Sequence, residues 1–243
     1  MPRDQDDILV VIPARGGSKG VSKKNLRLVG GIPLVCRAIQ CAQAARLVSR
    51  TVVSTDDPEI ATVAAGAGAE VAMRPGELAT DFASSESVVR HCLMHYAATV
   101  DFQPAAVIML QCTAPFTVPS DLDRAVRLWR DSALGSVVAV TRFEGFLWSQ
   151  REGKWEPVNH EKGFRQRRQD RTPEHVECGS FYLMDTDCFL EQGSRFCGRT
   201  ECLEISSARR LEIDGEEDFQ HANRIIEAEG DPLLKELRKI LVS

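Results

Sequence analysis

A short stretch near the N-terminus combines glycines, hydroxyls and cations behind an apolar run. It reads V-V-I-P-A-R-G-G-S-K-G-V-S-K-K-N from Val10 to Asn25. Glycines allow a sharp turn and let backbone N–H groups approach a ligand closely. The glycines are Gly16, Gly17 and Gly20, and the cations are Arg15, Lys19, Lys23 and Lys24. Because a triphosphate carries several negative charges and many acceptor oxygens, the stretch predicts a phosphate-binding loop.

Neither of two common phosphate loops matches this stretch. A Walker A loop needs a lysine followed by serine or threonine, whereas Lys19 is followed by Gly20. The dinucleotide-binding pattern G-x-G-x-x-G does not fit the glycine spacing either. The alternative interpretation is a glycine-rich surface turn flanked by solvated lysines. The apolar run from Ile8 to Ile12 and the density of cations favour ligand binding.

Two acidic residues near the C-terminus, Glu212 and Asp214, are candidate metal ligands. They lie in L-E-I-D-G-E-E-D-F, from Leu211 to Phe219. We expect residues 211–213 to form a short strand. Alternate residues of a strand share a face, so both carboxylates should point the same way. Such a pair can hold a Mg²⁺ ion that bridges phosphate oxygens. The alternative is an acidic cluster at a helix N-terminus, which the helix dipole favours.

Strand-like and helix-like segments alternate along most of the chain. Apolar and β-branched runs predict strands at residues 8–12, 51–55, 69–72, 105–110, 136–141, 178–184 and 203–205. Helical spacing, caps and helix-start prolines predict helices at residues 33–45, 58–66, 84–98, 119–129, 215–229 and 232–241. The alternation predicts an α/β fold of three layers, in which a mostly parallel, twisted sheet carries helices on both faces.

Length and composition are those of an ordinary globular domain. The chain has 243 residues, of which 43% are hydrophobic and 27% charged. The net charge of -5 argues against a general nucleic-acid binder. No apolar run approaches the roughly 20 residues that span a bilayer, and residues 1–7 are unlike a signal peptide. We therefore expect a cytoplasmic protein that binds neither nucleic acid nor membrane.

The sequence contains eight cysteines, none of them in a C-x-x-C pair. That spacing argues against a zinc site of the usual kind. Without an export signal, we expect reduced thiols that pack mostly as small apolar groups.

The alternation of strands and helices breaks between residues 142 and 177. This stretch is polar, contains two tryptophans and carries the basic run Arg165, Arg167, Arg168 and Arg171. It is too long for a simple connection within a compact domain. We therefore expect a single domain over residues 1–243 with a functional insertion at 142–177. The alternative for the basic run is a solvated, charged loop.

Several separated motifs together resemble the acylneuraminate cytidylyltransferases, the CMP-sialic acid synthetase family. I-P-A-R-G-G-S-K-G, followed by K-N at Lys24 and Asn25, is similar to that family's nucleotide loop. M-R-P-G-E-L-A-T-D resembles its R-P-x-E-L-A-x-D segment, and R-R-Q-D at residues 167–170 matches closely. L-E-I-D-G-E-E-D-F resembles I-D-I-D-x-x-E-D-F. The resemblance covers nearly the whole chain and implies a fold like that of the nucleotide-diphospho-sugar transferases.

The resemblance implies a reaction between CTP and a 2-keto-3-deoxy acid sugar such as a sialic acid-like nonulosonate, with Mg²⁺ as cofactor. The anomeric hydroxyl attacks the α-phosphorus, so that a CMP-sugar forms and pyrophosphate leaves. Such catalysis depends on positioning and on charge neutralisation. In the family the insertion mediates homodimerisation and helps to close the active site, and we expect the same of residues 142–177.

The resemblance also assigns roles to individual residues. The residues expected to bind the nucleotide are Arg15, Gly16, Gly17, Ser18, Lys19, Lys24, Asn25, Arg74 and Ser84. Arg15, Lys24 and Asp214 are expected to be catalytic, and Asp214 together with Glu212 is expected to bind the metal. The alternative for Arg74 is an ordinary exposed arginine before a proline turn.

Four residues are expected to bind the acid sugar: Gln111, Arg167, Arg168 and Gly179. Gln111 follows a predicted strand, where ligands gather in open α/β sheets, and its amide both donates and accepts. A guanidinium fork fits a carboxylate through two parallel hydrogen bonds, which makes Arg168 the first candidate for the sugar carboxylate and Arg167 the second. Gly179 allows the substrate to approach the backbone closely.

Departures from the family pattern keep other interpretations open. Cys112 replaces a usual proline, Thr117 stands where arginine is common, Cys178 falls in a motif without cysteine, and Glu212 replaces an aspartate. CMP transfer to a different acid, such as an eight-carbon keto-acid sugar or a phosphonate, is therefore an alternative. A CTP-binding regulatory protein without turnover is another. Cys178 is expected to be a packed or substrate-facing thiol, because the reaction needs no covalent intermediate.

Overall fold

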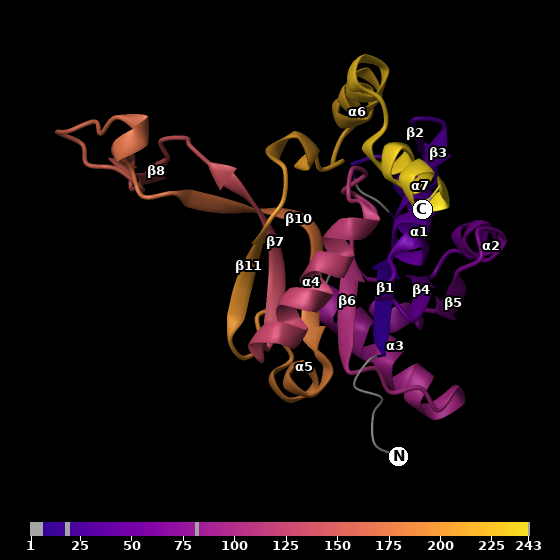
Figure 1. Ribbon diagram of the computed structural model, residues 1–243. Coiled ribbons are helices and arrows are strands. Elements are labelled where there is room, and N and C mark those ends of the chain that lie inside the picture. The colour runs from indigo at the N-terminus through magenta and orange to yellow at the C-terminus, as the bar shows by residue number, and fades with distance from the viewer. Residues whose placement is uncertain (1–6, 18–19, 81–82, 243) are drawn as a thin grey trace.

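The computed structural model of the chain describes residues 7–17, 20–80 and 83–242. Within these residues, seven strands form one sheet, and they are β1 (Ile8–Pro13), β4 (Arg50–Thr55), β5 (Glu70–Met73), β6 (Ala106–Leu110), β7 (Ser136–Phe143), β10 (Glu174–Asp185) and β11 (Thr200–Glu204). Their order is β11-β7-β10-β6-β1-β4-β5 (Figure 1). Neighbouring strands are parallel, except that β10 runs antiparallel to both β6 and β7.

Helices cover both faces of this sheet. One face packs against α1 (Leu34–Ala44), α2 (Pro58–Gly66) and α4 (Pro119–Ser132). On that side, α7 (Pro232–Val242) packs on α1 and α4, and α6 (Glu216–Glu229) packs on Leu28–Val29 beyond the sheet. The other face of the sheet packs against α3 (Ser85–Thr99) and α5 (Thr186–Gln192). The predicted three-layer α/β fold is therefore confirmed. None of the helices in the described part of the chain combines the length and apolar character that a membrane span requires.

One predicted element near the C-terminus is wrong. Residues 211–213 form no strand, although Ile213 is buried and its neighbours Glu212 and Asp214 are exposed. The side chains alternate as predicted, but the segment lies beyond the last sheet strand and its backbone bonds to a loop instead. The strand predicted at 203–205 lies slightly earlier, as β11.

The order of the strands creates a crevice at their carboxyl ends. The chain passes from β1 to β4 on one side and returns later to β6 on the other side. Loops that leave neighbouring strands in opposite directions open a space above the sheet, where ligands bind in folds of this class. The glycine-rich stretch directly follows β1, and Gln111 directly follows β6.

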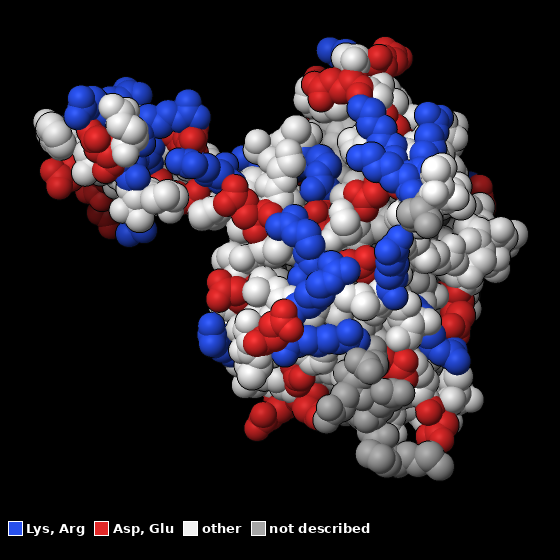
Figure 2. All heavy atoms as spheres, viewed as in Figure 1, with Lys and Arg blue, Asp and Glu red and all other residues white. Residues whose placement is uncertain are grey.

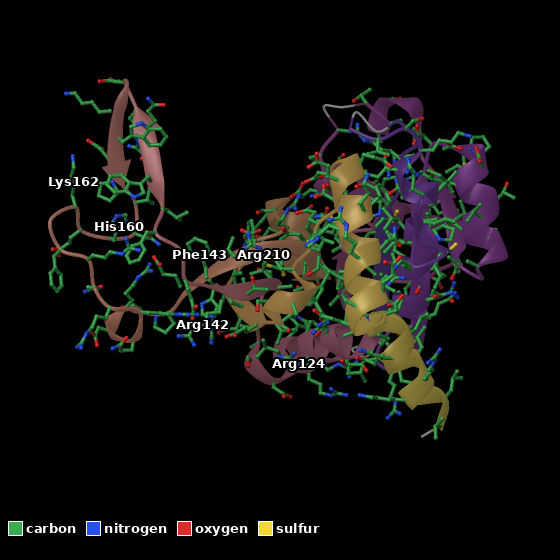
Figure 3. The ribbon with its side chains drawn as sticks, turned by 90° about the horizontal axis from the view of Figure 1, so that it is seen from above. Arg124, Arg142, Phe143, His160, Lys162 and Arg210 are labelled. Carbon is green, nitrogen blue, oxygen red and sulfur yellow. The ribbon has the colours of Figure 1, made fainter. Side chains whose placement is uncertain are left out.

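Between β7 and β10 the chain leaves the body of the molecule as an arm. The arm contains the hairpin of β8 (Trp148–Arg151) and β9 (Lys154–Pro157) and the 3₁₀ turn at Arg168–Asp170. Figures 1 and 3 show it projecting sideways, with His160 and Lys162 out on the arm and Arg142 and Phe143 at its root. A second small hairpin, β2 (Leu28–Val29) with β3 (Ile32–Pro33), follows the glycine-rich stretch.

A buried ion pair joins the N-terminal half of the fold to its C-terminal helix. Arg37 of α1 is 2% exposed and donates two hydrogen bonds of 2.7 Å to the carboxylate of Asp231. Its other N–H groups reach the carbonyl oxygens of Pro115 and Val29, both at 3.1 Å. Asp231 also accepts the backbone N–H of Leu233, at the start of α7. Because all three guanidinium nitrogens donate, in four hydrogen bonds, the charge is tolerated in the interior.

We predict that Asp231→Ala lowers the free energy of unfolding by about 3–5 kcal/mol, because it leaves a buried guanidinium without its counter-ion. Urea denaturation measures this loss. Arg199→Ala is the control, since Arg199 and Glu201 form an exposed pair at 3.7 Å, and its effect should stay below about 1 kcal/mol. Equal losses of unfolding free energy in the two variants would show that the buried Arg37–Asp231 pair stabilises the fold no more than an exposed pair does.

Candidate functional site

A cleft of about 310 Å³ lies at the carboxyl ends of β1, β4 and β6. Five of the residues predicted to bind substrates line it together: Arg15, Lys24, Asn25, Arg74 and Gln111. Its other lining residues are Pro13, Thr80, Ala83, Ser85, Val88, Cys112 and Thr113. Residues from three distant parts of the sequence, 13–25, 74–88 and 111–113, therefore meet where the strand order predicts a ligand site.

The glycine-rich stretch after β1 packs tightly at two of its three glycines. A Cβ on Gly16 would lie 2.6 Å from a carboxylate oxygen of Asp57, and the Gly16 N–H already donates to Asp56 at 3.0 Å. A Cβ on Gly20 would lie 2.4 Å from the backbone oxygen of Asp214. Gly17, by contrast, faces open space. The predicted contacts of Ser18 and Lys19 lie outside the described residues.

Lys24 connects this stretch to the acidic segment near the C-terminus. Its Nζ donates to the carbonyl oxygen of Ile213 at 3.0 Å and lies 3.5 Å from Oδ1 of Asp214. The Lys24 side chain is 15% exposed, whereas that of Asp214 is 78% exposed. The ammonium is thus held in place while the carboxylate remains accessible to a cation or a phosphate-bound metal.

Asn25 shapes the glycine-rich stretch from within. It is buried, and its Nδ2 donates to the carbonyl oxygen of Arg15 at 3.0 Å. This bond closes the turn and directs the chain around Arg15. Among residues 7–17, 20–80 and 83–242 no hydrogen bond is formed by the amide oxygen Oδ1, so the predicted role in nucleotide recognition would rest on that atom.

Arg74 is fixed against the end of β4. Its Nη2 donates to the carbonyl oxygen of Ser54 at 2.7 Å, and its Nε lies 3.3 Å from the hydroxyl of the same residue. Burial lowers the pKa of the guanidinium below its ordinary value, and the Asp56 carboxylate opposes that shift. The interpretation of Arg74 as an ordinary surface arginine is therefore wrong.

Ser84 caps a helix and does not line the cleft. Its Oγ accepts the backbone N–H of Ser87 at 3.1 Å and so begins α3. The neighbouring hydroxyl of Ser85 belongs to a residue that lines the cleft. Ser84 thus positions the start of α3 and Ser85 lines the cleft, while the contact of Ser84 with a nucleotide stays a prediction.

The loop after β6 is pinned to β10. The Gln111 N–H donates to the carbonyl oxygen of Ser180 at 2.9 Å, which leaves the side chain at the cleft. Cys112 is buried, and burial raises the pKa of its thiol to about 12. Thr117 is also buried and its hydroxyl donates to the carbonyl oxygen of Ala114 at 3.0 Å. Position 117 therefore faces the interior of the loop and does not reach the cleft.

The acidic pair is held by single contacts in place of a strand. The Ile213 N–H donates to the carbonyl oxygen of Thr113 at 2.8 Å, and the hydroxyl of Thr113 lies 3.4 Å from Oε1 of Glu212. Partial burial raises the pKa of Glu212, and the negative charge of Asp214 raises it further. A carboxylate whose charge is disfavoured by a second carboxylate beside it gains from a bound cation, to which both can offer oxygen ligands.

Two arginines that the sequence did not indicate as functional, Arg209 and Arg27, hold the acidic segment at residues 211–218 from both sides. Arg209 forms a bidentate ion pair with the buried carboxylate of Asp121, at the start of α4. Arg27 forms a bidentate pair with Glu216 at 2.7 and 3.1 Å. Asp218 then accepts the N–H groups of Asp214 and Gly215. An acidic residue on the apolar side of a predicted helix, Asp121, was the signal that could have indicated a buried partner.

Gly179 brings β10 close to Glu212. The pairing of β10 with β7 shifts between Glu177 and Tyr182, and Gly179 has a φ of 56° within this bulge. A Cβ there would lie 2.9 Å from Oε2 of Glu212, so glycine is required for the approach. The neighbouring Cys178 is buried and burial raises its pKa, which disfavours a nucleophilic role.

Glu212 also borders a second, larger cleft of about 620 Å³. The residues that line this second cleft are Glu177, Cys178, Ser207, Ala208, Arg210, Leu211, Glu212, His221, Ile225 and Glu229. Thr113, which contacts Glu212, lines the first cleft. The acidic pair therefore stands between a cation-lined cleft and a second space large enough for a small molecule.

Arg167 and Arg168 do not join either cleft of their own chain. Both lie on the arm with side chains that are 76% and 74% exposed. Arg167 pairs with Asp170 at 2.8 Å and Arg168 pairs with Glu144. Figure 2 shows many Lys and Arg side chains over the arm. Arg165, Arg167, Arg168 and Arg171 line a hollow of the arm together with Phe146.

The electrostatic coupling within the acidic pair gives a direct prediction. Asp214→Asn should lower the pKa of Glu212 towards its ordinary value, because one of the two causes of the upward shift is removed. A carbon-detected NMR titration of the Glu212 carboxyl, without metal, measures the change. Glu77 is an exposed acid outside the cleft, so Glu77→Gln should leave the pKa of Glu212 unchanged. An unchanged pKa of Glu212 in Asp214→Asn would show that the charge of Asp214 does not affect Glu212.

Comparison with known proteins identifies a family. Residues 9–145 match the family model described as cytidylyltransferase. N-acylneuraminate cytidylyltransferase A from Danio rerio is 33% identical over 226 residues, which are 91% of this chain and 51% of that protein. N-acylneuraminate cytidylyltransferase from Streptococcus agalactiae is 28% identical over 220 residues, which are 88% of this chain and 52% of that protein. The chain thus spans about half the length of these relatives.

A solved structure supports the fold. CMP:2-keto-3-deoxy-manno-octonic acid synthetase complexed with CTP superposes with a TM-score of 0.68 at 16% identity, covering 92% of this chain and 99% of that one. The matching family model covers more than half of this chain and includes Arg15, Lys24, Arg74 and Gln111 of the first cleft. The resemblance seen in the sequence is confirmed, and the chain belongs to the cytidylyltransferase family.

Proposed function

We propose that the protein transfers CMP from CTP to the anomeric hydroxyl of a sialic acid-like 2-keto-3-deoxy acid sugar and releases pyrophosphate. One observation carries the proposal: a cation-lined cleft at the carboxyl ends of the strands meets the carboxylates of Glu212 and Asp214. Similarity to N-acylneuraminate cytidylyltransferases supports the class of acceptor.

The first cleft suits a cytidine triphosphate. Arg15 and Lys24 place two positive charges along one wall, where they would neutralise phosphate oxygens and the charge that develops on the leaving pyrophosphate. Arg74 and Ser85 lie on another wall, beside the start of α3. Since Lys24 and Arg74 are already held by the protein, little reorganisation is needed when the nucleotide binds.

The donor set fits Mg²⁺. Glu212 and Asp214 supply hard oxygen ligands, and Mg²⁺ typically takes one or two carboxylates and completes its shell with water and substrate phosphates. No group of three or more candidate ligands is present among the described residues, as expected for a metal shared with a nucleotide. When bound, the ion would neutralise phosphate charge during the displacement. Glu212 and Asp214 would hold it next to Lys24.

The acceptor would lie beyond the acidic pair. Gln111 stands at the first cleft, and the backbone at Gly179 approaches Glu212 from the side of the second cleft. We propose that an acid sugar binds between them, with its anomeric hydroxyl towards the α-phosphate of the nucleotide. The amide of Gln111 would orient the sugar by donating and accepting hydrogen bonds.

We further propose that a homodimer completes the site and that the arm is its main contact. The arm exposes five large apolar side chains: Leu147, Trp148, Trp155, Val158 and Phe164. A two-stranded hairpin is marginally stable alone, and clustered apolar exposure marks protein interfaces. Arg168 lies on this arm and lines neither cleft of its own chain, so it would reach the sugar carboxylate of the partner's site.

We predict that Lys24→Ala and Asp214→Ala each reduce turnover at least about 100-fold, because each removes a charge that stabilises the transition state. The assay is pyrophosphate release from CTP and Mg²⁺ with a panel of nine-carbon and eight-carbon acid sugars and a phosphonate. Lys23→Ala is the matched control, since Lys23 pairs with Glu59 outside the cleft. Its rate should remain near that of the wild type.

The same panel decides between the candidate acceptors. Release with a nine-carbon acid alone supports the proposal, and release only with another acid would replace the acceptor. CTP binding without release from any acid would indicate a regulatory protein. Near wild-type rates in Lys24→Ala or Asp214→Ala would contradict the roles assigned here.

Mixing two inactive variants tests the shared site. The first is Lys24→Ala, and the second combines Arg167→Ala with Arg168→Ala. If each arm serves the partner's cleft, mixed dimers contain one intact site, and random exchange restores about a quarter of wild-type activity, since half the dimers are mixed and each has one active site of two. If the arm serves its own cleft, the mixture stays inactive. That result would contradict the proposal that each arm completes the partner's cleft.

A further inference from the structure

The acidic pair lies at the end of a connecting run, residues 205–213, that has few backbone bonds to the rest of the fold. The run leaves β11 at the edge of the sheet and reaches the first cleft at its far end. The Ile205 N–H donates to the carbonyl oxygen of Val140, and the Ile213 N–H donates to that of Thr113, both at 2.8 Å. Between these two bonds, in the described part of the chain, the backbone bonds only within the run's own 3₁₀ turn.

One side chain in the middle of the connecting run is bound to the body of the molecule. Both terminal nitrogens of Arg209 donate to the carboxylate of Asp121, and its Nη1 also donates to the carbonyl oxygen of Phe116 at 3.4 Å. The side chain of Asp121 is 1% exposed and that of Arg209 is 16% exposed, so water has little access to the pair. A bidentate contact of this kind fixes orientation as well as distance.

The connecting run presents two different sides to its surroundings. Its residues on either side of Arg209 line the second cleft, among them Ala208 and Arg210. The Arg209 side chain is directed instead to Asp121, in the first turn of α4. This helix packs on β7 and β10, and its apolar side chains belong to the core. Arg209 thus ties an otherwise weakly bonded stretch to a rigid element.

The loop after β6 holds the same run at a second point. Thr113 of this loop accepts the Ile213 N–H, and its hydroxyl lies 3.4 Å from Oε1 of Glu212. The chain then continues into α4, which binds Arg209. Because Thr113 also lines the first cleft, the single stretch 111–121 forms part of that cleft and locates the acidic pair relative to it.

We propose that Arg209 and Asp121 are positioning residues, which hold Glu212 and Asp214 where a divalent cation can bind them and the triphosphate together. The inference rests on the proposed function, in which Mg²⁺ accompanies CTP. Neither Arg209 nor Asp121 lines the first cleft. The pair acts through the chain, since Arg209 precedes Glu212 by three residues.

Loss of the pair would give the connecting run conformational freedom that a bound cation must then remove. Contacts that orient metal ligands from outside typically change metal affinity by about 10- to 100-fold when they are removed. The effect should therefore fall on the part of nucleotide binding that depends on the metal. Binding of CTP alone uses the cations of the first cleft, which Arg209 does not contact.

Calorimetry of CTP binding with saturating Mg²⁺, and again with EDTA, isolates the contribution of the metal. The ratio of the two affinities is the metal-dependent gain. Arg209→Ala should reduce this gain about tenfold, because the carboxylates are no longer held in place. The affinity in EDTA should stay near that of the wild type, since the first cleft keeps Arg15, Lys24 and Arg74.

Two further variants separate positioning from folding. Arg209→Ala leaves the buried carboxylate of Asp121 without its bidentate partner, which can itself destabilise the protein. The double variant Arg209→Ala with Asp121→Asn removes that charge too, and it should show the same reduced gain because the two residues act as a unit. Arg127→Ala removes an exposed arginine from the same helix and should keep the wild-type gain.

The double variant decides the outcome. An unchanged gain, or an equal fall of both affinities, would overturn the inference and leave the proposed function intact. A wild-type protein that binds CTP equally well with Mg²⁺ and with EDTA would contradict the proposed function, and this inference with it.

Discussion

The cleft depends on one ammonium group that joins two distant parts of the chain. Lys24 donates to the carbonyl oxygen of Ile213 and lies 3.5 Å from Asp214, 190 residues further along. At the same junction, Gly20 leaves no room for a Cβ beside the Asp214 backbone. The glycine-rich stretch and the acidic pair are therefore positioned by each other, and a nucleotide with its metal would bind across their contact.

Because residues 211–213 gain no support from the sheet, discrete contacts must hold the acidic pair. Arg209 with Asp121, Arg27 with Glu216, and the bond from Ile213 to Thr113 locate the segment from three directions. The bulge at Gly179 then brings β10 against Glu212. A segment held at points can adjust slightly when a metal and a triphosphate arrive, whereas a sheet strand would be rigid along its whole length.

The sequence sufficed to predict the layers of the fold, because period-two and period-3.6 patterns are local. Five residues that line the first cleft were predicted from the family resemblance, and three of them, Arg15, Arg74 and Gln111, closely follow strand ends. Ion pairs between distant residues could not be predicted from local patterns. The pair of Arg209 with Asp121, for example, is not indicated by the sequence around either residue alone. The same limit explains the false strand at 211–213, because alternation of side chains does not show whether a backbone finds a partner strand.

Binding of CTP, in the presence of Mg²⁺, to a variant with a disturbed junction tests the account most directly. Calorimetry should show that Gly20→Ala weakens CTP binding at least about tenfold, or 1.4 kcal/mol, because the new methyl group displaces the Asp214 backbone and with it the Lys24 contact. Gly76→Ala, whose Cβ meets nothing within 4 Å, should bind as the wild type does. Equal affinities for the Gly20→Ala variant and the wild type would contradict the claim that the two segments form one nucleotide site.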